Sequence, residues 1–280
     1  MREHVGRVLS SLVVLPLLYA AVRYLPAPYF ALVVAFVVVV SQLEFSQLAL
    51  QAGGSPSRSG RLPVLAIGVV GGAVLLVIMY HREWNALPVL ATVLTMGVGV
   101  AALAEENLRE ALPDAALAVF GVWYVAWLFG HVMWLRGLRG GEMLVLFAFW
   151  VTWWGDIAAY YVGRAVGRTP LAPRVSPKKT VAGAVGALVG GVIASLIAVA
   201  WFVEGFTWME AIALGLGGAA IGMIGDLVES LWKRSAGVKD SGGWIPSQGG
   251  MLDKIDGLVF TVPALYYYVW WVKGAHGVGG

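Results

Sequence analysis

Three acidic residues near the end of the chain have the spacing of a metal site. Asp253 and Asp256 are three positions apart, and Asp226 lies upstream of them. Three carboxylates brought together without a cation would repel one another. A ligand set made only of oxygen favours a hard cation such as Mg²⁺, which keeps open positions for phosphate oxygens. The three residues are therefore predicted to bind Mg²⁺, and a second cation at the same site is a further expectation.

Basic residues separate these carboxylates in the sequence. Lys233, Arg234 and Lys239 lie between Asp226 and Asp253, in a polar stretch flanked by two long apolar segments. Charge at a membrane boundary is costly unless it is paired, binds an ion or holds a substrate. The mixture of acidic and basic groups therefore predicts a metal and phosphate site, in which Lys233 and Lys239 act beside the carboxylates and Arg234 binds phosphate.

One helical face would carry several of these groups. Asp226, Glu229, Ser230 and Lys233 have relative spacings of 0, 3, 4 and 7 residues, which place them on the same side of a helix. Ser230 is accordingly a further candidate for phosphate binding.

Two structural interpretations of the acidic residues stay open. Asp253 and Asp256 have the spacing of a capping-box-like pair at the start of a helix. Asp226 could instead form an interhelical salt bridge with Lys254 or Arg234.

A second polar group ends an earlier apolar segment. Asp156 and Tyr160 share a helical face, and Arg164 and Arg168 follow as candidate phosphate ligands. Asp156 falls inside the apolar segment, where a carboxylate must be paired or functional. It is a candidate catalytic residue, and the alternative is a structural ion pair with Arg164 or Lys179.

A basic loop over residues 171–180 comes next. Ser176, Lys178, Lys179 and Thr180 supply phosphate donors just before an apolar segment. A helix that begins there would add backbone N–H groups and a favourable dipole. The alternative is that the positive charge only sets the membrane orientation or attracts anionic lipid.

Three further residues carry weaker signals. Gly249 and Gly250 would let the backbone approach a phosphate, or would belong to an ordinary flexible loop. Glu44 lies among apolar residues, where it either lines a polar groove or pairs with Arg58 or Arg61.

The composition excludes several classes of protein. Of 280 residues, 59% are hydrophobic and 12% are charged, whereas soluble domains have about 25% charged residues. The chain is therefore an integral membrane protein. It has no cysteine and four histidines, none of them in a metal-ligand pair, so thiol chemistry and a zinc site are not expected. No GxxxxGK[ST] pattern is present, which excludes a Walker ATPase.

The hydropathy pattern predicts an all-α polytopic membrane protein with about nine transmembrane helices. The expected segments are residues 5–22, 29–50, 63–80, 86–104, 113–131, 142–163, 181–203, 208–230 and 255–273. Each has about the length that a helix needs to cross a hydrocarbon core of roughly 30 Å.

If all of these segments cross the membrane, most of the 19 Lys and Arg residues lie on the same side of the membrane as the N-terminus. The positive-inside rule therefore predicts a cytoplasmic N-terminus, and the polar loops 164–180 and 231–254 would also face the cytoplasm. We expect residues 1–135 to form a transmembrane scaffold with lipid-facing helices, and residues 136–280 to form the catalytic region.

The C-terminal motif resembles the signature of the phosphatidate cytidylyltransferase (CDP-diacylglycerol synthase) family. The matching residues are Ser230, Lys233, Arg234, Lys239, Asp240, Pro246, Gln248, Gly249, Gly250, Asp253, Lys254 and Asp256. Upstream matches are Asp156, Tyr160, Gly163, Arg164, Gly167, Arg168, Ser176, Pro177, Lys178, Lys179, Thr180, Gly225, Asp226 and Glu229. These matches cover about residues 153–257, and the earlier segments match only in hydropathy.

The sequence departs from the family pattern in three places. Gln248 replaces a histidine, Lys254 replaces an arginine, and Val181-Ala182 replaces Trp-Glu. Glutamine keeps hydrogen bonding but cannot be charged, and lysine keeps the charge but loses the bidentate fork. Because the carboxylates and most basic groups remain, we expect activity.

The resemblance implies transfer of the cytidylyl group of CTP to phosphatidate or a similar phospholipid, which gives CDP-diacylglycerol and pyrophosphate. It also implies a metal-dependent, multi-pass enzyme of the inner (plasma) membrane that contacts membrane lipid, faces the cytoplasm with its active site, forms a homodimer and binds no nucleic acid. Gln248 is carried over as a phosphate ligand.

Two alternatives stay open. One is a related lipid enzyme, similar to a CDP-archaeol synthase or a polyprenol kinase. The other is an ion-coupled transporter, in which buried charges form an ion pathway; the chain has no repeat that relates its two halves, and its polar residues gather on one side.

Overall fold

The computed structural model describes residues 15–52, 61–243 and 249–274. In this part of the chain, eight helical segments are long and apolar enough to cross a membrane. Their bounds are Ala27–Ala52, Leu62–His81, Ala86–Ala104, Leu108–Arg136, Gly141–Val166, Val181–Trp201, Trp208–Ser235 and Leu252–Val272. They coincide with the last eight expected segments, which confirms the all-α polytopic fold. The first expected segment begins outside the described residues, and its residues 15–22 lie in a helix that continues to residue 24.

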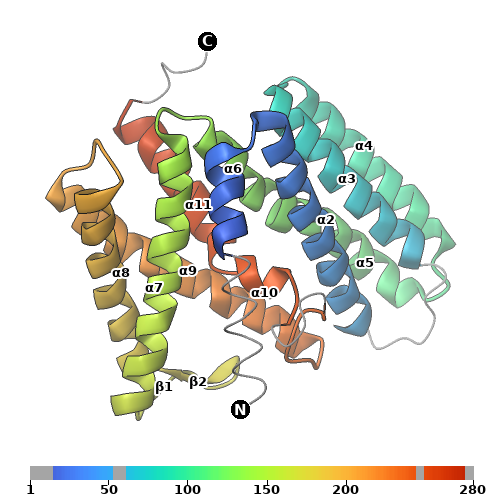
Figure 1. Ribbon diagram of the computed structural model, residues 1–280. Coiled ribbons are helices and arrows are strands. Elements are labelled where there is room, and N and C mark those ends of the chain that lie inside the picture. The colour runs from blue at the N-terminus through green and yellow to red at the C-terminus, as the bar shows by residue number, and fades with distance from the viewer. Residues whose placement is uncertain (1–14, 53–60, 244–248, 275–280) are drawn as a thin grey trace. The chain divides into compact units, whose positions relative to one another are not determined.

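Some spans contain more than one regular element (Figure 1). The helices are α2 (Ala27–Ala52), α3 (Arg61–His81), α4 (Ala86–Ala101), α5 (Leu108–Gly121), α6 (Leu128–Arg136), α7 (Gly141–Val166), α8 (Val181–Trp201), α9 (Trp208–Ser235), α10 (Leu252–Ile255) and α11 (Leu258–Tyr267). A 3₁₀ turn, η1 (Ala102–Ala104), follows α4, and π-helical turns η2 (Val122–Trp127) and η3 (Tyr268–Val272) follow α5 and α11.

The basic loop before α8 is a small hairpin. Strands β1 (Pro170–Ala172) and β2 (Ser176–Thr180) pair antiparallel, with Pro170 opposite Thr180 and Ala172 opposite Ser176. The last residue of β2 also caps α8, because the Thr180 hydroxyl accepts the Gly183 N–H at 3.1 Å. The predicted helix start after this loop is therefore confirmed.

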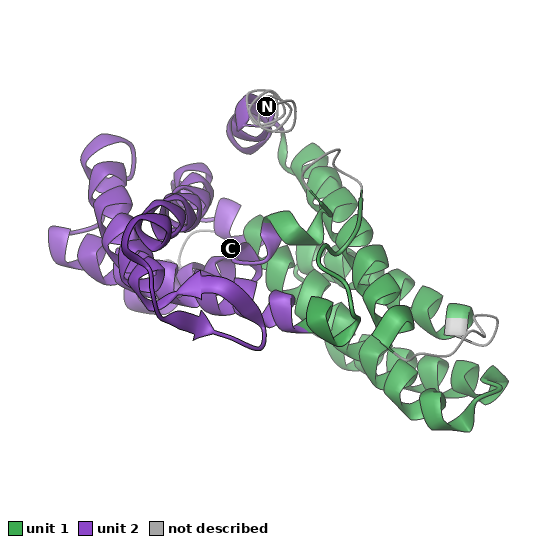
Figure 2. Ribbon diagram, turned by 90° about the horizontal axis from the view of Figure 1, so that it is seen from below, with its two compact units in different colours: residues 1–14, 26–133, 232–254 green, residues 15–25, 134–231, 255–280 purple. Residues whose placement is uncertain are grey.

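The chain divides into two compact units (Figure 2). Unit 1 comprises residues 1–14, 26–133 and 232–254, and unit 2 comprises residues 15–25, 134–231 and 255–280. These bounds reflect packing, whereas the expected division at residue 135 concerns scaffold and catalysis and stays a prediction.

In unit 1, α2, α3, α4 and α5 pack on one another. The core contains polar residues as well as apolar ones. Gln42 is 1% exposed and donates from Nε2 to the Gly68 carbonyl at 2.7 Å, which pairs α2 with α3 inside the unit. An aromatic cluster of Phe45, Phe120, Tyr124 and Trp232 joins α2, α5 and η2 to the last turn of α9. The last turn of α9 therefore packs on the aromatic side chains of this unit.

In unit 2, α7 and α8 pack along their lengths on a line of small residues. A Cβ at Gly186 would come within 2.7 Å of the Val162 side chain, and a Cβ at Gly191 would come within 2.7 Å of the Gly215 carbonyl. Close backbone approach replaces side-chain burial here, as is common between membrane helices. α8 is thereby fixed between α7 and α9, and the hairpin that precedes it is fixed as well.

Candidate active site

Helix α9 carries two acidic residues of unit 2 on one face. Asp226 is partly buried, Glu229 is 0% exposed, and the three-residue spacing directs both side chains to the same side of the helix. The Ser230 hydroxyl lies 3.4 Å from Asp226 Oδ1 and donates to it. The predicted shared face of Asp226, Glu229 and Ser230 is therefore present.

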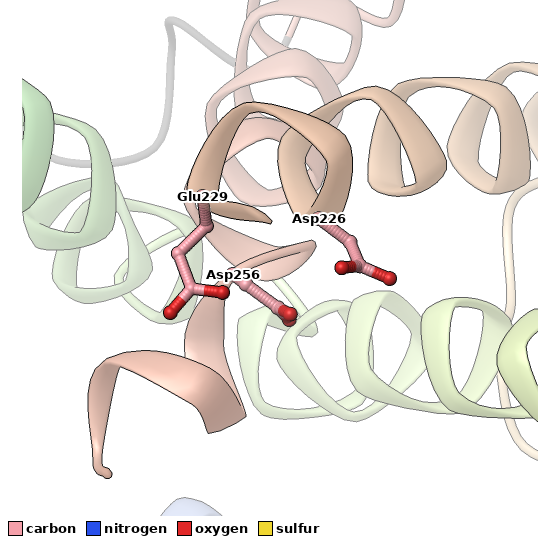
Figure 3. A group of neighbouring side chains, drawn as sticks. All are labelled: Asp226, Glu229 and Asp256. Atoms are coloured by element: carbon pink, nitrogen blue, oxygen red, sulfur yellow. The ribbon is translucent and has the colours of Figure 1, made fainter. Parts of the chain in front are cut away.

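Asp256 completes the group from the segment that follows α10. This segment lies directly against α9. A Cβ at Gly225 of α9 would clash with the Asp256 carbonyl. One ligand oxygen from each of Asp226, Glu229 and Asp256 lies within 4.8 Å of the other two, and the three carboxylates point toward the same side (Figure 3). Carboxylates at this separation fit a hard cation such as Mg²⁺ or Ca²⁺, which takes only oxygen ligands.

A lysine from the hairpin reaches the same group. Lys179 of β2 forms an ion pair with Asp226, and both side chains are about a quarter exposed. Asp156 of α7 interacts electrostatically with both members of this pair. Unit 2 thus brings together Asp156, Lys179, Asp226 and Asp256 of the predicted site, and adds Glu229.

The structural alternative for Asp226 named other partners, whereas Lys179 is one of the two partners weighed for Asp156. Asp226 pairs with Lys179 in place of Lys254 or Arg234. Arg164 donates from Nη1 to the Tyr160 hydroxyl at 3.0 Å. Thus the described ion pair of this region joins Asp226 to the hairpin.

Asp253 belongs to a different arrangement, within unit 1. Its Oδ1 lies 2.6 Å from Lys233 Nζ, and its Oδ2 accepts the N–H groups of Ser241 at 3.1 Å and Gly250 at 2.7 Å. The bond from Gly250, three residues earlier, is the one that a carboxylate in the first turn makes in a capping box. The pair considered from the sequence, with Asp253 as the cap and Asp256 three residues later, is different, because Asp253 lies inside α10. Its role as a metal ligand stays a prediction.

Glu44 of α2 holds the neighbouring part of the same segment. Its carboxylate accepts the N–H groups of Met251 at 2.9 Å and Leu252 at 2.7 Å. Arg58 and the side chain of Arg61, the partners weighed for Glu44, lie outside the described residues.

The glycines before α10 approach carboxylates of the protein itself. Gly249 has a φ of +87°, which favours glycine, and a Cβ there would lie 2.6 Å from Asp253 Oδ2. A Cβ at Gly250 would lie 2.6 Å from either oxygen of Glu44. Their predicted approach to a substrate phosphate is not tested by this geometry.

The remaining predicted phosphate ligands are mostly exposed. Lys178, Arg168 and Lys239 are exposed, and Ser176 is half-buried. Arg234 donates from Nη1 to the Val238 carbonyl at 2.9 Å. Gln248 falls outside the described residues.

Sequence reasoning did not assign a role to Glu229 in the metal set. Its spacing of three residues from Asp226 was a usable signal, but the proximity of Asp253 to Asp256 in the sequence favoured Asp253 instead. Glu44 carried only its isolation among apolar residues as a signal, and its partners lie more than 190 positions away.

Comparison with known proteins identifies the family. The sequence matches the family described as "Cytidylyltransferase family" over residues 5–272. The chain belongs to the cytidylyltransferase family. This membership confirms the resemblance inferred from the C-terminal motif.

Individual cytidylyltransferase relatives differ in how much they share with this chain. The phosphatidate cytidylyltransferase of Pseudomonas aeruginosa is 32% identical over 280 residues, which covers 94% of this chain and 96% of the relative. The phosphatidate cytidylyltransferase of Synechocystis is 42% identical over 130 residues, or 46% of this chain and 44% of the relative. The uncharacterized protein YnbB of Escherichia coli is 39% identical over 153 residues, or 55% and 50%. The chain thus spans about half the length of the last two relatives and almost all of the first.

Proposed function

We propose that this cytidylyltransferase transfers the cytidylyl group of CTP to phosphatidate in phospholipid biosynthesis, giving CDP-diacylglycerol and pyrophosphate. The observation that carries the proposal is the group formed by Asp226, Glu229 and Asp256 with Lys179 beside it. Its support from relatives is the match over nearly the whole length of the Pseudomonas aeruginosa phosphatidate cytidylyltransferase.

The reaction joins two anions. A phosphate oxygen of phosphatidate attacks the α-phosphorus of CTP, a new P–O bond forms, and the bond to the β-phosphate oxygen breaks to release pyrophosphate. The lipid phosphate is already anionic near neutral pH, so the protein must mainly neutralise charge and hold the reactants in line. No strong general base is required.

The chain offers groups suited to these tasks. Asp226, Glu229 and Asp256 would hold Mg²⁺, the metal that the oxygen-only donor set favours. A bound divalent cation supplies charge neutralisation at phosphate oxygens. Lys179 adds a positive charge at the same carboxylates and would bind a phosphate oxygen once Asp226 turns to the metal. Asp253 and a second cation remain part of the proposal from the sequence motif.

Other basic and polar residues are proposed to bind the phosphates of CTP and lipid. They are Ser176, Lys178, Thr180, Arg164, Arg168, Ser230, Lys233, Arg234, Lys239, Gln248, Gly249 and Gly250. The Thr180 hydroxyl caps α8 by accepting the Gly183 N–H. Its own proton can still be donated to a phosphate oxygen. We also propose that Asp156 contributes to the electrostatic field of Asp226 and Lys179.

A direct test is turnover of the purified protein in detergent with labelled CTP, phosphatidate and Mg²⁺. The expected products are CDP-diacylglycerol and pyrophosphate, and both should disappear on chelation. CDP with a phosphorylated lipid would instead indicate a kinase. Transfer only to an isoprenoid ether phosphate would indicate a CDP-archaeol synthase, and uptake of ions without nucleotide would indicate a transporter.

The placement of the protein is also a proposal. The charge distribution favours an inner-membrane enzyme with a cytoplasmic N-terminus and active site, and family resemblance favours a homodimer. Because the chain has no cysteine, a single introduced cysteine reports its own side of the membrane. Ser235→Cys should react with an impermeant maleimide only after the cytoplasmic side is opened, whereas Glu83→Cys should react in intact spheroplasts. The reverse pattern would overturn the orientation, and crosslinking in the membrane tests the dimer.

A further inference from the structure

Glu44 is a buried carboxylate that holds a distant part of the chain. It lies on α2, is 0% exposed, and belongs to unit 1 together with residues 232–254. Oε1 accepts the Met251 N–H at 2.9 Å, and Oε2 accepts the Leu252 N–H at 2.7 Å and the Ser241 hydroxyl at 3.3 Å. Burial of a carboxylate is costly unless hydrogen bonds compensate for lost water, and donors meet both oxygens here.

The surrounding segment is built to fit this carboxylate. Gly242 and Gly250 both lie so close to Glu44 that a Cβ at either position would overlap its oxygens. The segment therefore needs glycine on both sides of the Glu44 carboxylate. This requirement explains Gly250 of the C-terminal motif, and Gly242 just after Asp240 and Ser241, without reference to a ligand.

Glu44 and Asp253 accept hydrogen bonds from the same two short stretches of chain, at residue 241 and at residues 250–252. Ser241 donates its N–H to Asp253 and its hydroxyl to Glu44. The Gly250 N–H goes to Asp253, and the next N–H, that of Met251, goes to Glu44. Movement at Glu44 would therefore be passed directly to the groups that orient Asp253.

We propose that Glu44 is a positioning residue for cytidylyl transfer, which holds residues 241 and 250–252 so that the Asp253–Lys233 pair keeps its geometry. The inference rests on the proposed function, since Asp253 and Lys233 matter to turnover only if they serve that reaction. Glu44 itself touches no substrate in this proposal and acts through the backbone.

The test compares Glu44→Gln and Glu44→Asp with Gln42→Leu. The glutamine variant offers one acceptor oxygen and turns an NH₂ group toward a backbone N–H, whereas aspartate keeps both acceptors one methylene shorter. Gln42→Leu removes a buried hydrogen bond from the same helix without touching the 241–252 segment. It therefore controls for loss of a buried polar contact on α2.

Hydrogen exchange and kinetics are measured on the full-length protein in nanodiscs, well below its unfolding temperature. For Glu44→Gln we expect amide exchange at Met251 and Leu252 to rise at least tenfold and kcat to fall at least tenfold, with partial recovery of both in Glu44→Asp. The Mg²⁺ concentration for half-maximal rate should stay within twofold. Gln42→Leu should keep the wild-type kcat and the wild-type exchange at these amides.

Two results would overturn the proposal. Unchanged exchange at Met251 and Leu252 would show that Glu44 does not hold the segment. Faster exchange with wild-type kcat would show that the segment's order is irrelevant to the reaction. If the wild-type protein makes no CDP-lipid at all, the proposed function fails and this role fails with it, while the exchange data still report whether Glu44 anchors the backbone.

Discussion

Asp253 and Asp256 are three positions apart in the sequence but lie in different surroundings. Asp256 lies beside two other carboxylates, with one oxygen each of Asp226, Glu229 and Asp256 within 4.8 Å of the other two, and its Oδ1 accepts the Gly257 N–H at 2.7 Å. Asp253 meets an ammonium group and two backbone N–H donors. A carboxylate that already has such donors gains little from a cation, whereas clustered carboxylates gain much. We therefore propose that the group in unit 2 is the stronger candidate for metal binding and that the network in unit 1 orders the backbone, with Asp253 as a metal ligand left as the competing prediction.

Asp256→Asn should have the largest effect, and it tests directly whether the unit 2 carboxylates bind a cation. Removal of one charge from the group should weaken cation binding and lower turnover by about 10²-fold or more, the scale of losing a preorganised electrostatic contact in a site. Mn²⁺ binding, followed by electron paramagnetic resonance without substrate, should weaken in parallel. Normal Mn²⁺ affinity in a folded variant would contradict the metal assignment.

Asp253→Asn tests whether Asp253 orders the backbone or binds the cation. The amide would turn a donor toward Lys233 or the backbone N–H groups, so we expect turnover to fall by roughly 10²-fold through lost organisation of the segment. Mn²⁺ affinity should stay close to wild type. If Mn²⁺ binding weakens as much as in Asp256→Asn, the sequence-based metal set of Asp226, Asp253 and Asp256 is the better one.

This contrast marks where sequence reasoning succeeded and where it stopped. The spans could be predicted because each needs only length and apolar composition, and α7, α8 and α9 lie within a few residues of expectation. The faces of helices could be predicted as well, since spacing alone places Asp226 and Glu229 together.

Pairing between remote segments could not be predicted. Glu44 reaches a segment about 200 positions away, and no local pattern encodes that contact. The two acids at 253 and 256 have a spacing that suits a metal site and a helix cap equally well. Only their three-dimensional neighbours separate the two roles.

Lys179→Met should have an intermediate effect. The lysine neutralises Asp226 in the absence of metal, so its loss should leave Mn²⁺ binding unchanged or tighter, while turnover falls by about 10- to 100-fold, as is typical when a supporting residue of a metal site is lost. Arg174→Met, in the exposed turn between β1 and β2, makes the same charge change as a control. Weaker Mn²⁺ binding in Lys179→Met would show that the lysine organises the carboxylates instead of competing with a cation.

Glu210→Gln should have the smallest effect, because it removes charge from the other end of α9. Glu210 and Thr207 form a reciprocal capping box, in which Glu210 Oε2 accepts the Thr207 N–H at 2.7 Å and Thr207 Oγ1 accepts the Glu210 N–H at 3.2 Å. Glu210 Oε1 also lies 2.9 Å from Lys273 Nζ and accepts the Tyr268 hydroxyl at 2.8 Å.

Sixteen residues of helix, or about 24 Å, separate Glu210 from Asp226. We expect Glu210→Gln to lower stability by about 1 kcal/mol, the scale of a lost cap or hydrogen bond, and to leave kcat and Mn²⁺ affinity unchanged. Thermal unfolding in detergent measures the first, and the turnover assay measures the second. A tenfold loss of turnover without unfolding would mean that α9 transmits changes along its length. The group of Asp226, Glu229 and Asp256 would then depend on the far end of the helix as well as on its own neighbours.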